Sequence, residues 1–99
     1  MKVRHLTCKL QIVIMKERDA FIAYCPALDL STCGSSEKDA QKMFEDAAGE
    51  FFRFCLLKGT LDEVLQDYGW EKAETDENTN LPWLPPHIVS GAREVTVSA

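Results

Sequence analysis

Alternating apolar and polar residues mark the first third of the chain as a set of strands. Residues 6–15 alternate residue by residue, which is typical of a strand with one buried face. The end of that run is apolar on both faces, which favours a central place in a sheet. A second strand is expected over Ala20–Cys25, where Pro26 ends it, and a third, at an edge of the sheet, over Leu30–Gly34.

The middle of the chain has the periodicity of helices. Apolar residues recur at i, i+3 and i+4 over residues 40–56 and predict an amphipathic helix of about 20 residues. Ser36 is suited to cap its N-terminus and Gly59 its C-terminus. Residues 60–63, Thr-Leu-Asp-Glu, match a capping box that opens a second, short helix, on which Trp70 can fold back.

The last third of the chain is less regular. Residues 72–80 are polar and acidic without a period, and residues 81–86 contain three prolines. Both stretches are typical of a linker. Further on, Val95 and Val97 alternate with polar residues and predict a last strand.

Together these elements predict the fold class. The order β-β-β-α-α-linker-β is typical of an α+β two-layer sandwich, with one long helix on one face of a mainly antiparallel sheet. A three-strand meander followed by a crossover gives the strand order 3-2-1-4. We expect a core over residues 1–71, an acidic and proline-rich linker over 72–86, and a strand within 87–99 that completes the sheet or exchanges in a dimer.

Length and charge narrow the choice of function. The chain has 99 residues, enough for one domain, and its 11 basic and 16 acidic side chains give a net charge of −5. An acidic domain opposes binding to phosphate backbones, so direct DNA binding is not expected. The longest apolar run near the start, residues 12–15, is far shorter than the ~20 residues that cross a membrane. We expect a cytoplasmic protein with no targeting segment and no membrane partner.

The sequence offers little catalytic chemistry. Residues 6–15 lack the carboxylate that a two-metal nuclease needs on its first strand. Nothing places His5 or His87 beside a thiol, and an enzyme that uses Cys25 or a histidine is the least favoured hypothesis. We therefore expect no catalytic residues, no metal and no cofactor. The four cysteines form no CxxC pair and are expected to be reduced, although Cys25 and Cys33 could also form a disulfide across a hairpin; they are Cys8, Cys25, Cys33 and Cys55.

Charge is unevenly distributed along the chain. Residues 60–80 carry a net charge of −6, whereas residues 1–20 carry +3. The acidic stretch is either a solvated loop that aids solubility or an electrostatic landing surface for a basic partner.

Residues 21–52, FIAYCPALDLSTCGSSEKDAQKMFEDAAGEFF, resemble the HicB antitoxin family. The family pattern has an aromatic and a small residue, Pro-x-Leu, Ser/Thr-x-Gly and a Ser/Thr before an Ala-rich helix. Residues 58–71, KGTLDEVLQDYGWE, are also similar to the end of many small members. The likeness covers about residues 6–71, and the matching positions are Phe21, Ala23, Pro26, Leu28, Thr32, Gly34, Ser36, Ala40 and Ala47.

The resemblance implies a reduced ribonuclease-H-like fold and an antitoxin function. HicB-like domains usually neutralise HicA, a small basic ribonuclease toxin, and many carry a C-terminal DNA-binding module. Here 19 residues follow Asn80, with three prolines and no helical period, so self-repression through DNA is not expected.

We therefore expect a non-enzymatic antitoxin that masks the active surface of a small basic HicA-type ribonuclease. The alternative is a stand-alone oligomeric domain that binds a ligand or regulates another protein. The expected partner-binding residues are Tyr24, Pro26, Leu28, Asp29, Asp62, Glu63, Asp67 and Glu71. A homodimer or higher oligomer is also expected, and its interface residues are Phe52, Phe54, Val95 and Val97.

Overall fold

The structure is a computed structural model that describes residues 8–73 and 82–98. It confirms an α+β fold with a three-stranded antiparallel sheet, a long helix and a short helix. The elements in chain order are β1 (Val13–Glu17), β2 (Ala20–Cys25), β3 (Leu30–Gly34), α1 (Glu37–Lys58), α2 (Leu61–Asp67), β4 (Glu71–Lys72) and β5 (Trp83–Leu84).

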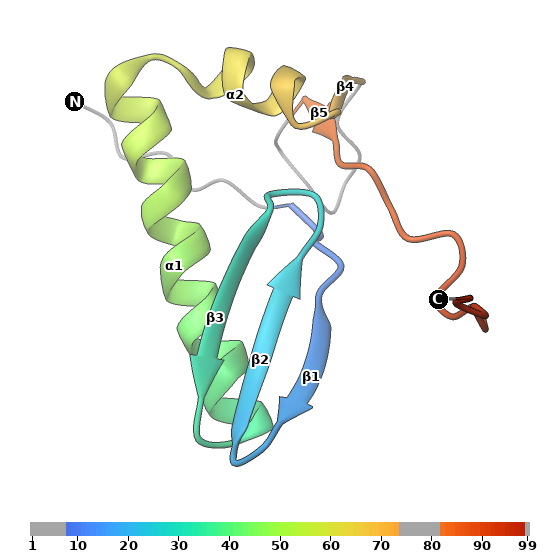
Figure 1. Ribbon diagram of the computed structural model, residues 1–99. Coiled ribbons are helices and arrows are strands. Elements are labelled where there is room, and N and C mark those ends of the chain that lie inside the picture. Colours follow the sequence, from blue (N-terminus) through green and yellow to red (C-terminus); the bar gives the residue numbers. More distant parts are fainter. Residues whose placement is uncertain (1–7, 74–81, 99) are drawn as a thin grey trace.

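The sheet is a meander in which β2 lies between β1 and β3 (Figure 1). Ile14 on β1 and Thr32 on β3 lie opposite Ala23 on β2, so these three residues share one face. On that face Ala23 and Cys25 are fully buried. The other face of β2, which includes Tyr24, is only half-buried. One face of the sheet therefore builds the core, and both expected ranges for β2 and β3 are confirmed.

The first strand differs from its expected extent and position. Residues 8–12 are not in a strand, β1 begins at Val13, and Leu6 and Thr7 lie outside the described residues. Within the described part of the chain β1 pairs only with β2, so it lies at an edge of the sheet. The expectation of a central first strand was wrong here. In this edge strand one face is left open, and Val13 on that face is 37% exposed. Apolar residues on both faces therefore do not require a central position in the sheet.

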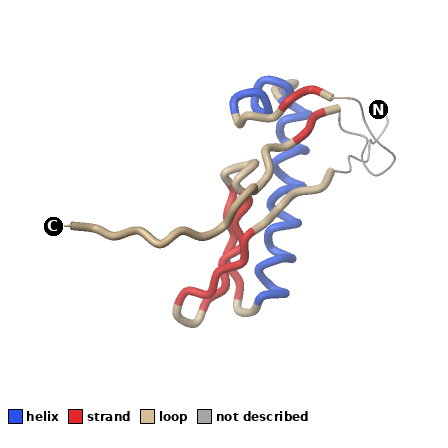
Figure 2. The backbone as a smooth tube through the Cα atoms, turned by 90° about the vertical axis from the view of Figure 1, so that its right-hand side faces the viewer, coloured by secondary structure: helices blue, strands red, loops and turns tan. Residues whose placement is uncertain are grey.

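The expected fourth strand is not found beside β1. Residues 85–98 have no regular secondary structure, and they extend away from the sheet (Figure 2). A strand needs a neighbour for its backbone hydrogen bonds, and this segment has none among the described residues. The order 3-2-1-4 is therefore replaced by a sheet of order β1-β2-β3 and a separate ribbon of β4 and β5.

Helix α1 covers one face of the sheet (Figure 2). It buries Ala40, Phe44 and Ala48 against the strands. The approach is closest at Gly34, where an added Cβ would lie 2.5 Å from the backbone nitrogen of Ala40. Thr32 reinforces the crossing, because its hydroxyl donates to the carbonyl of Ala40 over 3.1 Å. Small residues thus let the helix backbone lie directly on β3.

Both ends of α1 are capped as the sequence predicts. The Ser36 hydroxyl accepts a hydrogen bond from the backbone N–H of Asp39 over 3.0 Å. At the other end Gly59 adopts a left-handed conformation with φ of +68°. The capping box expected at Thr60 does not form, since its side chain makes no capping hydrogen bond. Helix α2 is instead fixed by packing, through the fully buried Leu65.

Candidate interaction surface

The turn between β2 and β3 is held by hydrogen bonds among its own residues. The backbone N–H of Leu28 donates to the carbonyl of Cys25, and that of Asp29 donates to the carbonyl of Pro26, each over 3.3 Å. Asp29 has a φ of +49°, a left-handed conformation that Asp tolerates better than most residues. Its carboxylate accepts a hydrogen bond from the Tyr24 hydroxyl over 3.0 Å. The turn therefore holds its exposed side chains in a fixed geometry.

The contact between Tyr24 and Asp29 also makes the tyrosine a weaker acid. The hydrogen bond to the Asp29 carboxylate, helped by partial desolvation, raises the pKa of Tyr24 above its ordinary value. The hydroxyl therefore holds its proton more tightly and donates it to Asp29 in a hydrogen bond. The carboxylate retains free lone pairs that can accept a hydrogen bond from a partner.

Trp70 ties the chain beyond α2 to this turn. Its indole Nε1 donates to the carbonyl of Ala27 over 2.8 Å, across 43 positions of sequence. The side chain is 3% exposed and packs edge-on against Phe52, with 6.4 Å between ring centroids. As a result, α2 and the β2–β3 turn lie at the same end of the molecule (Figure 1).

Helix α2 and β4 present an acidic surface. Residues 60–73 contain one basic side chain, Lys72, and four carboxylates, all exposed: Asp62, Glu63, Asp67 and Glu71. In the part of the chain that the structure describes, none of these carboxylates is in an ion pair; the ion pair seen there joins Arg53 to Glu50 on α1. Charge on this surface is therefore available to an external partner.

A short β-ribbon closes the acidic surface on one side. Lys72 on β4 pairs with Trp83 on β5, and the backbone N–H of Ala73 donates to the carbonyl of Pro82 over 3.2 Å. Trp83 is 7% exposed, and its indole Nε1 donates to the Asp62 carboxylate over 3.0 Å. The Lys72 ammonium lies 5.6 Å from the centroid of the Trp83 ring. Apart from Asp62, these residues fall within residues 72–86, the segment expected to be a linker, and the ribbon was not predicted from the sequence.

The predicted partner-binding residues divide into two groups. Pro26 and Asp29 are exposed and Tyr24 is half-buried at the turn, and the acidic residues are exposed on the adjoining α2 and β4. Leu28 is the exception, since it is 2% exposed and belongs to the core. Leu28 therefore positions the turn from below and offers no surface to a partner, which corrects the sequence-based expectation.

The predicted oligomer-interface residues are spread over the molecule. Phe52 is half-buried between Phe51 and Trp70, whereas Phe54 is 60% exposed with the Lys58 ammonium 5.8 Å from its ring centroid. Val95 and Val97 are 76% and 85% exposed in the extended C-terminal segment. The structure therefore does not gather these residues into one surface within a single chain.

Cys8 and Cys25 lack the features of reactive thiols. All four cysteines are free, and Cys25 and Cys55 are buried. Burial raises the pKa of Cys25 and, together with the nearby Cys25, that of Cys8. A raised pKa keeps a thiol protonated, which is the opposite of what a nucleophile needs. Within residues 8–73 and 82–98 no group of three His, Cys, Asp or Glu residues is placed to hold a metal ion.

No protein-family model, curated protein or solved structure matches this chain significantly. The resemblance to HicB therefore rests on the sequence pattern itself. Among the described helices, neither is both long and apolar enough to span a bilayer.

Proposed function

We propose that this chain is a HicB-like antitoxin that binds a small basic ribonuclease and masks its active surface. The observation that carries the proposal is the joining of the β2–β3 turn to the acidic helix α2 through the Trp70–Ala27 hydrogen bond. An anchored turn thus lies beside a set of exposed carboxylates that form no ion pair with any described residue. We call the two together the acidic end, defined by Pro26, Asp29, Asp62, Glu63, Asp67 and Glu71.

A ribonuclease toxin supplies the complementary chemistry. An enzyme that grips RNA needs basic side chains that neutralise the phosphates. The same basic side chains would be attracted to the acidic end, which can occupy the surface that RNA needs. Such complementarity speeds encounter and fixes orientation. The turn would add shape and hydrogen bonding through Pro26 and the Asp29 carboxylate.

The test is co-purification with a small basic ribonuclease encoded beside the gene for this chain. The informative variant is Asp67→Lys with Glu71→Lys. Both residues are exposed, and Lys at position 67 suits the C-terminal end of α2, so the fold should tolerate the change. We expect the affinity to fall at least about 30-fold, since like charges placed across an interface cost several kcal/mol.

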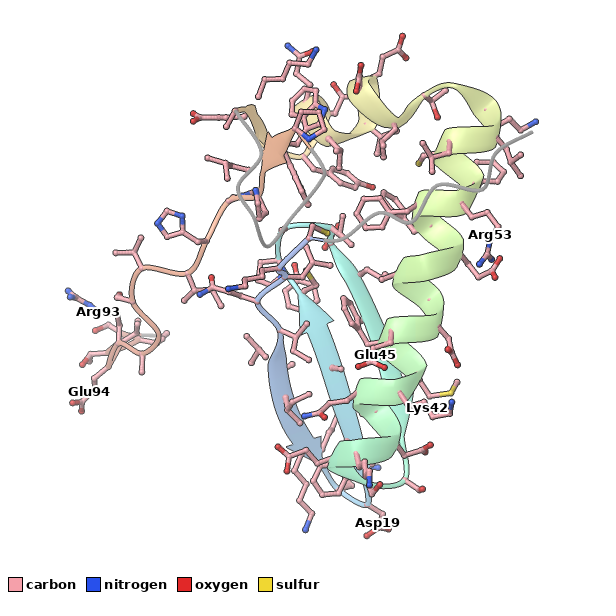
Figure 3. The ribbon with its side chains drawn as sticks, turned by 180° about the vertical axis from the view of Figure 1, so that it is seen from behind. Asp19, Lys42, Glu45, Arg53, Arg93 and Glu94 are labelled. Carbon is pink, nitrogen blue, oxygen red and sulfur yellow. The ribbon has the colours of Figure 1, made fainter. Side chains whose placement is uncertain are left out.

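The matched control is Glu17→Lys with Asp19→Lys. It makes the same two substitutions and changes the net charge equally, but Asp19 lies at the opposite end of the molecule from α2 (Figure 3). We expect this control to bind almost as tightly as the original chain. Equal weakening by the two double variants would show that overall charge, and not the acidic end, controls binding. Absence of any complex with the original chain at micromolar concentration would refute the proposal.

A further inference from the structure

β1 has an open edge, and the residues just before it line a mostly apolar groove. In the part of the chain that the structure describes, β1 pairs with β2 on one side only, which leaves backbone groups of its other side available for a further strand. Between residues 8–12 and α1 lies an open groove of about 540 Å³. Most of its lining side chains are apolar, among them Leu10, Ile12, Phe44, Ala48 and Phe52, and Gln41 and Glu45 add two polar groups.

The C-terminal segment has the complementary pattern. Residues 92–98 alternate apolar Val95 and Val97 with polar Glu94, Thr96 and Ser98, as a strand with one buried face does. Both valines are almost fully exposed, at 76% and 85%. Arg93 and Glu94 cancel in charge, so the segment is not repelled by the lysines near β1.

Residues 92–98 do not pack on the rest of their own chain, since all of them are exposed. The radius of gyration is 15.7 Å and the longest extent is 55 Å, whereas a compact chain of this length has a radius of gyration of about 13 Å. The N–H of Ile88 donates to the side-chain oxygen of Gln11 just before β1. Beyond Ile88 the chain leaves the body in an extended form, directed away from the three-stranded sheet (Figures 1 and 2).

We propose that residues 92–98 of one copy add a strand to the β1 edge of a second copy and place Val95 and Val97 in its apolar groove. Each chain then gives one strand and receives one, which closes a symmetric dimer. The added strand would supply hydrogen-bond partners for the open edge of β1. It would also cover Phe52 on the side that faces solvent. Binding of a ribonuclease is not required for this assembly.

Residues 92–98 do not lie along β1 of their own chain, although the contact between Ile88 and Gln11 brings the segment to the start of that strand. All of these residues are exposed. A second copy can receive the segment in the extended form that the structure shows. The same strand-to-edge contacts are available in both arrangements, and the extended form of residues 89–98 favours the second copy.

The experiment measures the mass of the full chain in solution by light scattering at micromolar concentrations. We expect twice the 11.2 kDa of one chain. Val95→Lys with Val97→Lys should raise the dissociation constant of the dimer at least about 100-fold, because two charged side chains would enter an apolar groove. The matched control, Thr96→Lys with Ser98→Lys, adds the same charge on the opposite side of the strand and should stay dimeric.

Hydrogen exchange identifies the site of the contact. The amides of residues 12–17 should exchange more slowly in the original chain than in the valine variant, while those of α1 should be unchanged and report an intact fold. A single-chain mass for the original protein would overturn the proposal, since it would mean that no exchange occurs. A dimer that survives the valine substitutions, or equal exchange along β1 in both proteins, would also overturn it.

Discussion

Replacing Trp70 by Phe should destabilise the protein far more than the same change at Trp83. Both indoles are buried and each donates one hydrogen bond. Trp70 donates to the buried carbonyl of Ala27, which would be left without that partner. Leaving a buried acceptor unsatisfied costs about 1–3 kcal/mol. Trp83 donates to the carboxylate of Asp62, an exposed residue to which water can return, so its loss should cost less than about 1 kcal/mol.

Both variants remove the same ring volume, so the difference in their stabilities compares the two hydrogen bonds. A urea titration of each variant, followed by circular dichroism at the helical signal, measures its midpoint of unfolding. With a urea m-value of about 1–1.5 kcal/mol per M, a cost of about 1–3 kcal/mol for Trp70→Phe should lower the midpoint by about 0.7–3 M. Equal midpoints for the two variants would refute the reasoning, because they would mean that the Trp70–Ala27 hydrogen bond does not hold α2 on the turn.

Three further predictions concern the core and the helix cap. Gly34→Ala should lower the free energy of unfolding by about 1–3 kcal/mol, because the added Cβ would clash with the α1 backbone. Gly49 has open space around it, so Gly49→Ala should stabilise α1 by up to about 1 kcal/mol. Thermal unfolding compares the two variants. Ser36→Ala should cost about 1 kcal/mol in the same assay through loss of the N-cap hydrogen bond. Iodoacetamide at pH 8 should modify the exposed Cys33 first and Cys25 only after unfolding, because burial raises the pKa of Cys25. Mass spectrometry follows the order of modification. Early modification of Cys25 would contradict its placement in the core.

Local patterns were sufficient to predict the central elements of the fold. The strands β2 and β3 and both caps of α1 follow from residues close in sequence, such as Pro26, Ser36 and Gly59. Those signals act over one turn or one strand, and tertiary contacts reinforce them here. Burial of Leu28 was not predictable, because a hydrophobic residue in a short connection can point outward or inward with the same local sequence.

Long-range contacts account for most of what the sequence did not predict. The Trp70–Ala27 hydrogen bond joins residues 43 positions apart, and the pairing of Lys72 with Trp83 crosses an acidic stretch without a period. The capping box at Thr60 failed for a related reason, since packing of Leu65 positions α2 without it. The alternation around Val95 and Val97 predicted a strand. A strand needs a neighbouring strand for its hydrogen bonds, and one chain supplies none among its described residues.

For the candidate site, the sequence predicted the kind of surface better than its construction. Acidic residues after position 60 could be counted directly, and the structure leaves those it describes exposed. Their position beside the β2–β3 turn depends on Trp70, which no spacing rule connects to Ala27. Charge can therefore be predicted from composition, whereas the shape of the surface requires the tertiary contact.

The central claim is tested most directly by titrating this chain into the RNA-cleavage assay of a small basic ribonuclease of the proposed kind, if one is encoded beside the gene for this chain. The account predicts complete inhibition near one chain per enzyme. It also predicts that Asp67→Lys with Glu71→Lys loses inhibition, while Glu17→Lys with Asp19→Lys retains it. Full ribonuclease activity in the presence of excess original chain would contradict the account.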